Sequence, residues 1–213
     1  MVLGGGGHAR VLIDSLQLGG ACAIRGILDR DTARHGGLVL GVLVLGGDEL
    51  LAGLARDGVA WFVVGFAGVR DNRPRQRMFE EAVAKGLRPL TVVHPSAIVS
   101  RHAVIGAGCQ IFPGAIVNAG AVLGAHVIVN SGAIVEHDCR VGDHAHVAPA
   151  ACLAATVIVG ERAHIGAGST LRQGVTVGAD AVVGVGAAVV NDVPSTHVVV
   201  GVPARQLMRR PDR

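Results

Sequence analysis

The distribution of aliphatic residues divides the chain into two parts. From residue 93 onward every sixth position is Val, Ile or Leu, and this period holds without interruption over seventeen positions. Because these three residue types make up 29 of the 97 residues from 93 to 189, such a run arises by chance with odds on the order of 10⁻⁸. The positions are Val93, Val99, Ile105, Ile111, Val117, Leu123, Val129, Val135, Val141, Val147, Leu153, Val159, Ile165, Leu171, Val177, Val183 and Val189.

The fourth residue after each aliphatic position is Ala, Cys, Ser or Val. Two inward positions in a period of six fit neither a helix face nor a simple alternating strand. They predict a solenoid in which each six-residue unit forms one short side of a coil, with the small residue at a crowded corner. Gly follows the aliphatic residue in seven units, between Gly106 and Gly184. We expect these glycines to supply turn conformations that larger residues disfavour.

This pattern resembles the hexapeptide-repeat acyltransferases. The resemblance implies a left-handed parallel β-helix with three units in each triangular coil, whereas a Gly- and Ala-rich sandwich would not keep one phase over so many residues. A step of three units stacks Ile98, Ile116, Ile134 and Cys152 in one outward column. Because an exposed apolar column needs a partner surface, we expect self-association along it, as in the homotrimers of this family.

Residues 1–88 have a different pattern, in which short apolar runs alternate with helical patterns. This alternation is typical of a parallel sheet with crossover helices. The predicted fold class is therefore α/β plus all-β. We expect a small Rossmann-like domain over residues 1–88, a β-helix over 89–204 and a basic tail over 205–213. Helices are expected after the Gly4–Gly7 run, near 48–55 and near 74–85.

A glycine-rich loop, Gly4 to Gly7 followed by His8, joins the first apolar run to the first predicted helix. Such a loop lets a phosphate approach the backbone and the positive helix end, although a glycine run is as often a flexible turn. Asp29 closes the second strand, where a carboxylate can accept hydrogen bonds from a ribose or a nucleobase. A turn residue before Arg30 is an equally good interpretation of Asp29.

Together, the Gly-Gly-His loop and the repeats resemble the sialic-acid O-acetyltransferase-like sugar acyltransferases. Within them the chain is similar to the N-acetyltransferases of nucleotide-linked 4-amino sugars, as in the bacillosamine and perosamine pathways, over nearly its whole length. The resemblance implies acetyl-CoA as co-substrate and a nucleotide-activated amino sugar, with a UDP-4-amino-6-deoxyhexose expected, as acceptor. It places the nucleotide at Gly6, Gly7, His8, Asp29 and Arg30.

Two features of the nucleotide site are not determined by the sequence. The first strand has about three residues where ~5–6 are usual, so either the chain starts upstream or the site is unusually open. The family often has an arginine soon after its fourth strand. Residues 70–77 of this chain contain four arginines, which could also form a solvated basic face. The sequence does not choose among the candidates, which are Arg70, Arg73, Arg75 and Arg77.

The most polar stretch of the repeats, residues 130–146, carries the candidate catalytic groups. His137 occupies an outward position, flanked by Glu136 and Asp138. Acyl transfer to an amine needs a group that takes a proton as nitrogen attacks the thioester, and imidazole suits this task near neutral pH. The resemblance assigns the base to His137 and its orientation to Asp138, with Glu136 as second candidate. It also places His146 and Asn130 at the acceptor or the thioester.

The last coils match the coenzyme-A end of these enzymes. The resemblance puts a backbone oxyanion donor at Ala155, where the family commonly has Gly, and a backbone donor does not require that side chain. No Cys or Ser has a neighbouring base that would activate it, so we expect direct transfer without an acyl-enzyme. CoA contacts are expected at Gly166, Ala167, Gly184, Val185 and Arg205, with Arg209 and Arg210 either at the phosphates or in a frayed basic tail.

The sequence leaves three alternatives open: a sugar O-acetyltransferase of the sialic-acid type, a nucleotide-sugar-binding scaffold without activity, and a zinc protein of the γ-class carbonic anhydrase kind. The last rests on His146 and His164, which should stack on adjacent coils; we expect no metal. A net charge of +3 and five aromatic residues exclude a typical nucleic-acid-binding protein. The longest apolar run, 59–69, is too short for a bilayer, and no secretory signal is evident, so we expect no membrane insertion and a cytoplasmic location.

Overall fold

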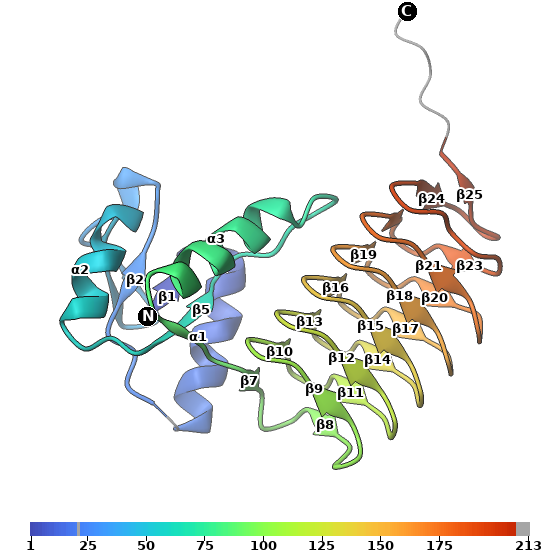
Figure 1. Ribbon diagram of the computed structural model, residues 1–213, viewed down its shortest axis with the longest axis horizontal. Helices are drawn as coiled ribbons and strands as arrows, with labels where there is room; N and C mark the ends of the chain where they lie inside the picture. The colour runs from blue at the N-terminus through green and yellow to red at the C-terminus, as the bar shows by residue number, and fades with distance from the viewer. Residues whose placement is uncertain (21, 208–213) are drawn as a thin grey trace, which may run out of the picture.

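The computed structural model describes residues 1–20 and 22–207. It consists of an α/β domain and a long stack of short parallel strands that lie side by side (Figure 1). No helix within these ranges is long and apolar enough to cross a membrane. Residues 208–213, including Arg209 and Arg210, lie outside the described residues.

The N-terminal domain is a six-stranded sheet in the order β3-β4-β2-β1-β5-β6, parallel except for the antiparallel pair β3–β4. Its strands are β1 (Val2–Leu3), β2 (Ile27–Leu28), β3 (Leu38–Val39), β4 (Val42–Gly46), β5 (Trp61–Val64) and β6 (Arg88–Pro89). Its helices are α1 (Gly7–Gly19), α2 (Leu51–Arg56) and α3 (Arg73–Ala84), with 3-10 turns at Thr32–Arg34 and Asp48–Leu50.

The three helices cover both faces of this sheet, which gives the predicted Rossmann-like layering. Leu12 and Ile13 of α1 pack with Val2 on one face, whereas Leu51 of α2 and Met78 of α3 belong to the core on the other. α1 ends where Gly20 takes a left-handed conformation (φ 61°) and donates its N–H to the Leu16 carbonyl, a common way to close a helix.

From Val92 onward the chain forms a triangular prism of strands with two residues each, or three in β24, in three sheets that we call faces 1, 2 and 3. Face 1 contains β7 (Val92–Val93), β10 (Gln110–Ile111), β13 (Ile128–Val129), β16 (His146–Val147), β19 (His164–Ile165), β22 (Val182–Val183), β24 (Val198–Val200) and β25 (Arg205–Gln206). Face 2 contains β8 (Ile98–Val99), β11 (Ile116–Val117), β14 (Ile134–Val135), β17 (Cys152–Leu153), β20 (Thr170–Leu171) and β23 (Ala188–Val189). Face 3 contains β9 (Val104–Ile105), β12 (Val122–Leu123), β15 (Arg140–Val141), β18 (Ile158–Val159) and β21 (Thr176–Val177).

The six-residue period determines the prism core. Every predicted inward aliphatic residue from Ile111 to Val189 is buried. The first three are not, and Val93 is 43% exposed, because the first coil has no coil beneath it. Strands pair one full coil apart, and Ile98, Ile116, Ile134 and Cys152 stack on face 2 as predicted.

The glycines that follow the aliphatic positions have a different purpose from the one predicted. None of the seven has a left-handed φ. A Cβ on Gly160, for example, would lie 2.4 Å from the backbone nitrogen of Ala179 in the next coil. These positions exclude a side chain because coils approach closely, so the expectation that they supply turn conformations is wrong. Positive φ falls two residues later, at residues as different as Gly132, Asp138 and Ala150.

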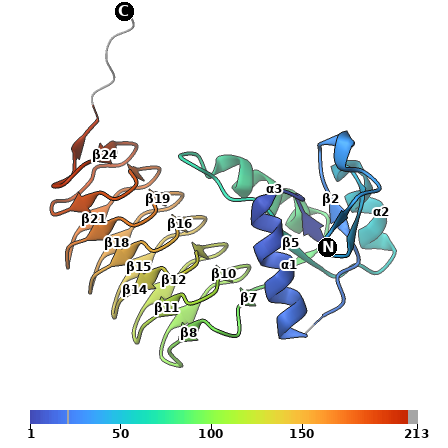
Figure 2. The ribbon, with the colours of Figure 1, turned by 180° about the vertical axis from the view of Figure 1, so that it is seen from behind.

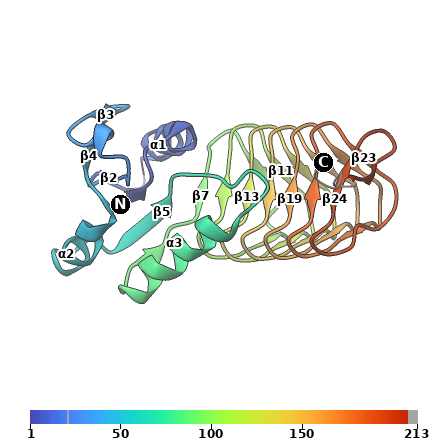
Figure 3. The ribbon, with the colours of Figure 1, turned by 90° about the horizontal axis from the view of Figure 1, so that it is seen from above.

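Two contacts join the domain to the prism. α1 lies beside β7 and β10 of face 1 (Figure 2), and Phe112 and Ile128 share a core with its apolar side. α3 extends alongside the prism when the molecule is seen from above (Figure 3). At the far end, Arg205 and Gln206, expected at the start of a tail, form β25 against β24.

Candidate functional site

A pocket of about 410 Å³ opens at the carboxyl ends of β1, β2 and β5. Parallel sheets place ligand sites at this edge, whereas a second hollow beside Met1 and Trp61 lies at the amino ends of the strands. Three of the predicted nucleotide residues, Gly6, Asp29 and Arg30, line the pocket. The full lining is Gly4, Gly5, Gly6, Leu28, Asp29, Arg30, Asp31, Arg34, Asp48, Phe66, Pro74, Arg77 and Met78.

The Asp29 carboxylate holds the glycine-rich loop in place. Its Oδ2 accepts a hydrogen bond from the Gly5 N–H at 2.6 Å, and its Oδ1 accepts one from the Asp31 N–H at 2.9 Å. A Cβ on Gly5 would lie 3.1 Å from Oδ2, so the loop comes close to this carboxylate. Each carboxylate oxygen can accept a second hydrogen bond, which leaves Asp29 able to contact a ligand.

The arginines of the pocket differ in what they contact. Arg30 Nε donates to Asp48 Oδ2 at 2.5 Å. Arg34 donates to Asp31 Oδ2 at 3.2 Å and to the Gly5 carbonyl at 3.0 Å. The side chain of Arg77, on α3, makes no hydrogen bond or ion pair with any other described residue, and it is the one of the four arginines of residues 70–77 that lines the pocket.

Gly7 and His8, also predicted at the nucleotide, do not line this pocket. The His8 ring is directed to face 1, where Nε2 is 2.7 Å from Gln110 Oε1 and the ring centroid is 4.9 Å from that of Phe112. Gln110 Nε2 donates in turn to the Val64 carbonyl at 2.8 Å. Burial lowers the pKa of His8 to about 4, so the ring is neutral at pH 7. His8 therefore ties the start of α1 to the prism.

His137 lies at the turn between β14 and β15, on the edge between faces 2 and 3. Its Nδ1 is 2.9 Å from Asp138 Oδ2, and the two side chains are 56% and 63% exposed. Glu136 Oε2 accepts a hydrogen bond from the His137 N–H at 3.2 Å. In the next coil Ala155 lies beside this turn, since the N–H of Thr156 donates to the His137 carbonyl at 3.0 Å, and the Ala155 N–H has no partner among the described residues.

His146 and Asn130 form a second group on face 1 and its edge with face 2. His146 Nδ1 donates to the Gly68 carbonyl at 3.1 Å, and Nε2 accepts from Asn130 Nδ2 at 3.1 Å. Burial lowers the pKa of His146 to about 3, so the ring stays neutral. The His164 ring lies 5.0 Å away. In the part of the chain that the structure describes, no three His, Cys, Asp or Glu side chains are arranged to hold a metal ion.

Four of the five predicted CoA residues, all except Arg205, lie at the edge between faces 1 and 2. Gly166 is buried there, and a Cβ on it would lie 2.5 Å from the Val183 carbonyl oxygen, so coil packing accounts for this glycine. Ala167 and Gly184 are half-buried and Val185 is 80% exposed. Arg205 is exposed on β25.

Within one chain the pocket of the N-terminal domain, the His137 turn and the Asn130–His146 group lie apart from one another. The N-terminal domain packs on face 1, and His137 lies at the edge of the prism that does not border face 1. Face 2 separates the His137 turn from Asn130 and His146. No pattern in the sequence indicated this separation. The sequence does contain a signal for the contact between the N-terminal domain and the prism, because three polar residues interrupt an otherwise apolar column on face 1: Gln110, His146 and His164.

Known proteins with similar sequences and structures have the same fold as this chain. Residues 1–82 match the model of the PglD N-terminal domain family. No curated protein sequence matches the chain. PerB from Caulobacter crescentus, solved with CoA and GDP-perosamine, is 41% identical over 97% of this chain and 96% of its own, with a TM-score of 0.90.

Two further structures are similar. The acetyltransferase domain of PglB from Neisseria gonorrhoeae, solved with acetyl coenzyme A, is 36% identical over 97% of both chains, with a TM-score of 0.89. WeeI from Acinetobacter baumannii is 23% identical over 97% of this chain and 98% of its own, with a TM-score of 0.85, and supports the fold alone. The expected fold class, a Rossmann-like domain followed by a left-handed parallel β-helix, is confirmed. The chain therefore belongs to the hexapeptide-repeat sugar acyltransferases, in the group of nucleotide-sugar N-acetyltransferases of the bacillosamine and perosamine type.

Proposed function

We propose that the protein transfers the acetyl group of acetyl-CoA to the amine of a nucleotide-linked 4-amino-6-deoxyhexose in the cytoplasm. The observation that carries the proposal is the outward His137–Asp138 pair, joined at 2.9 Å beside the Ala155 N–H, which has no partner among the described residues. The ligands of the relatives support it: CoA and GDP-perosamine for PerB, and acetyl coenzyme A for PglB. The resemblance predicts a UDP-linked acceptor, and the GDP-linked sugar of PerB makes both nucleotides necessary in the assay.

The arrangement of the pair supports a separate role for each of its two side chains. With Nδ1–H donating to Asp138, the lone pair of His137 lies on Nε2, which accepts a proton from the amine as nitrogen attacks the thioester carbonyl. The new C–N bond forms, the C–S bond breaks, and CoA leaves as its thiol when protonated His137 returns the proton to the sulfur. The Ala155 N–H is the donor to the oxyanion that develops between these events.

The thiols near this site favour direct transfer over an acyl-enzyme. Cys139 is buried, its Sγ donates to the Ala154 carbonyl at 3.1 Å, and burial raises its pKa to about 11. Burial also raises the pKa of Cys152. Because the thiolate is the nucleophilic form, both cysteines are poor nucleophiles at neutral pH.

The nucleotide site is proposed in the pocket beside Gly6, Asp29 and Arg30. Arg77 is the arginine that we propose for the diphosphate. It has no carboxylate partner among the described residues, whereas Arg30 and Arg34 already contact acidic side chains. Charge-assisted contacts of this kind are among the stronger hydrogen bonds.

We further propose that the working unit is a homotrimer. The His137 edge and the nucleotide pocket lie on opposite sides of one prism, so transfer requires the pocket of one chain to face the His137 edge of another. Association along face 2 would cover the apolar column that includes Ile98, which is 64% exposed. In this arrangement Asn130 and His146 of one chain approach the His137 turn of its neighbour, and CoA lies between prisms against Ala167 and Val185.

Turnover tests the activity. Purified protein is incubated with acetyl-CoA and UDP-, GDP-, CMP- or dTDP-linked 4-amino sugars, and release of the CoA thiol is followed. We expect one nucleotide series to react, and His137→Ala to lose about 10²–10⁴-fold in kcat while nucleotide binding stays intact. Full activity of His137→Ala contradicts the mechanism, and transfer to the 4-hydroxy analogue alone indicates a sugar O-acetyltransferase.

Complementation between chains tests the trimer. His137→Ala lacks the base but keeps its pocket, and Arg77→Met weakens the pocket but keeps its base. Mixed, refolded together and assayed at a nucleotide-sugar concentration well below the KM of Arg77→Met, the two variants are expected to give more activity than the sum of the separate variants, because some sites combine an intact pocket with an intact edge. A monomer by light scattering at micromolar concentration, or no recovery in the mixture, contradicts the shared site.

A further inference from the structure

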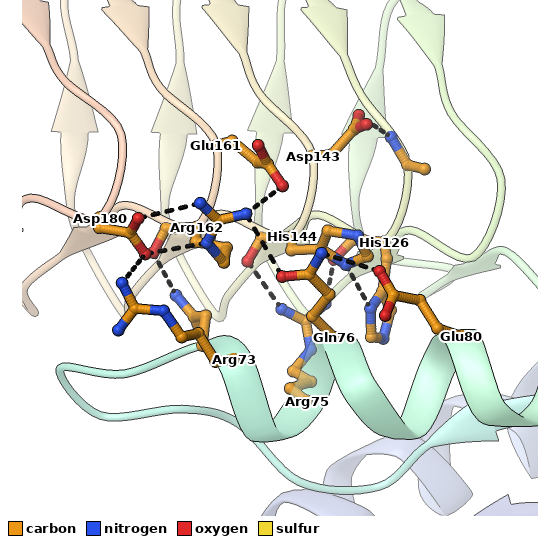
Figure 4. A network of polar contacts seen from close by, with 12 residues as sticks. Arg73, Arg75, Gln76, Glu80, His126, Asp143, His144, Glu161, Arg162 and Asp180 are labelled. Atoms are coloured by element: carbon orange, nitrogen blue, oxygen red, sulfur yellow. Dashed lines mark hydrogen bonds and ion pairs between the residues drawn. The ribbon is translucent and has the colours of Figure 1, made fainter. Parts of the chain in front are cut away.

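Helix α3 lies along the edge of the prism between faces 3 and 1 (Figure 4). One side of this helix supplies Pro74, Arg77 and Met78 to the nucleotide pocket. Another side supplies Arg75 to the prism, and Asn72, the N-cap residue that precedes the helix, contacts the prism as well. The same rigid element is therefore part of both the pocket and the contact between the two domains.

The contacts of α3 with the prism repeat from coil to coil. Arg75 Nη1 donates to the His144 carbonyl at 3.2 Å, and Nη2 donates to the His126 carbonyl. Asn72 Nδ2 donates to the Arg162 carbonyl at 3.0 Å. His126, His144 and Arg162 are equivalent residues of successive coils, each with a positive φ of 57–59°. No described backbone N–H donates to these three carbonyls, so the helix satisfies acceptors that the coils leave free.

The spacing of the helix matches that of the coils. Asn72 and Arg75 are three residues apart, a rise of about 4.5 Å along a helix. Neighbouring strands, and hence coils, are ~4.7–4.9 Å apart. Because the two repeats nearly coincide, a donor at the N-cap of α3 and a donor in its first turn meet carbonyls one coil apart, and the helix has a defined register along the prism.

Charged side chains at the start of the helix support the same register. Arg162 donates to both oxygens of Asp180 at 2.9 Å, and Arg73 Nη2 lies 3.2 Å from Asp180 Oδ1. Arg162 also donates to Gln76 Oε1 at 3.3 Å. These groups are partly exposed, so they contribute less to the free energy of docking than the buried contacts.

Burial of the charged Arg75 side chain has a free-energy cost that a purely stabilising contact between the domains would not need. Its side chain is fully buried, its Nε has no partner among the described residues, and it forms no ion pair with any described acidic residue. Burial lowers its pKa to about 9, and the guanidinium remains protonated at pH 7. An apolar side chain of similar volume usually stabilises a core as well as or better than a buried charge. The benefit of Arg75 must then lie in where it holds the helix.

We propose that Arg75 is a positioning residue: by spanning two coils it fixes α3, and with it the nucleotide pocket, at one height along the prism relative to the acetyl-transfer edge. This inference rests on the proposed function for its effect on catalysis. Its structural part, the register of the helix, does not depend on which reaction the protein performs. Misplacement by about 1 Å can cost ~10²-fold in rate, so loss of the register is expected in kcat.

The test is Arg75→Met, which keeps most of the volume and removes both hydrogen bonds. We expect kcat to fall about 10²-fold, with KM for acetyl-CoA within twofold of the original and a change in melting temperature of a few degrees. Lys85→Met is the matched control, because it removes one positive charge from the exposed end of the same helix, where Lys85 pairs only with Glu81 among the described residues. It should stay within twofold in kcat.

Hydrogen exchange gives a readout that needs no turnover. In Arg75→Met the amides of α3 should lose protection while those of the prism keep theirs, and this outcome is observable even if no sugar is acetylated, in which case the proposed function fails and the register stands. An unchanged kcat in an active protein, or unchanged protection of α3, overturns the proposal, as does equal loss of protection throughout. If Arg75→Met does not fold, Arg75→Lys, which reaches one carbonyl, should show an intermediate kcat. An unchanged kcat of Arg75→Lys would then overturn the proposal.

Discussion

Acid should weaken the junction between the two domains before it affects the rest of the chain. Five of the ten histidines lie at this junction, and burial is the largest cause that lowers the pKa of each. His8 contacts Gln110, His126 and His144 lie beneath α3, and His146 contacts Gly68. The five are His8, His126, His144, His146 and His164.

The sign follows from proton uptake. A histidine has a pKa near 6.5 in the unfolded chain, whereas that of His8 is about 4 and that of His146 about 3 in the folded protein. Between the folded and unfolded values the unfolded chain binds more protons, so stability falls as pH falls below 6.5, by up to about 1.4 kcal/mol per pH unit and group. At pH 5 these two residues together cost about 4 kcal/mol, out of a total of about 5–15 kcal/mol for a typical domain.

The remaining three histidines act in the same direction. His126 and His144 share one hydrogen bond between their Nδ1 atoms at 3.1 Å, and only one of the two can carry the proton there. A second proton removes this bond and adds a charge beside Arg75. His126 lies against Phe79 of α3, with ring centroids 4.4 Å apart, and because this buried ring is also close to the charge of Arg75, its protonation should loosen the helix.

Urea unfolding between pH 7.5 and 5.0 measures the effect. We expect the free energy of unfolding to fall by at least about 4 kcal/mol and an intermediate with an intact prism to appear, visible as earlier exposure of Trp61. His8→Gln, which removes one titrating group and keeps a hydrogen-bonding side chain, should reduce the pH dependence by about 2 kcal/mol. Equal stability at both pH values would refute the assignment of neutral, buried rings to this junction.

Three further predictions concern single side chains. Asp138→Asn should lower kcat/KM by up to about 10⁴-fold, with KM for acetyl-CoA unchanged, and a fully active variant would show that Asp138 does not orient His137. Arg77→Met should raise KM for the nucleotide sugar about tenfold or more at unchanged kcat, and an unchanged KM would exclude Arg77 from the diphosphate. Gly160→Ala should cost about 3 kcal/mol in urea unfolding and Gly132→Ala about 1 kcal/mol, because a Cβ meets the next coil at Gly160 and open space at Gly132; the reverse order would contradict the packing argument.

The repeat shows how much a one-dimensional pattern can determine. Each inward residue contacts residues one coil away, so the period of six is sufficient to predict the prism, its three faces and the column that contains Ile98 and Ile116. The same period is sufficient to place His137 at an outward corner. The purpose of glycines such as Gly160 escaped prediction, because the period does not reveal how closely adjacent coils approach.

Side chains at the junction behave differently. Nothing in the local pattern distinguishes Arg75 from Arg77, two residues apart on one helix, yet Arg75 is fully buried against carbonyls of the prism and Arg77 lines the pocket proposed for the nucleotide. His8 follows a glycine-rich loop and was therefore predicted to contact the nucleotide. Its ring instead forms a hydrogen bond on face 1 with Gln110, more than a hundred residues away in sequence.

The sequence alone thus determined the β-helix, the Rossmann-like domain and the chemical nature of the candidate base, because these depend on neighbours at fixed spacing along the chain. The tertiary structure alone decided which arginine faces the pocket, where His8 is directed and how the edge that carries His137 lies relative to that pocket. Those outcomes depend on contacts between segments whose separation in sequence has no period, and the free energy of such contacts is set by burial and hydrogen bonding that only the assembled domains create.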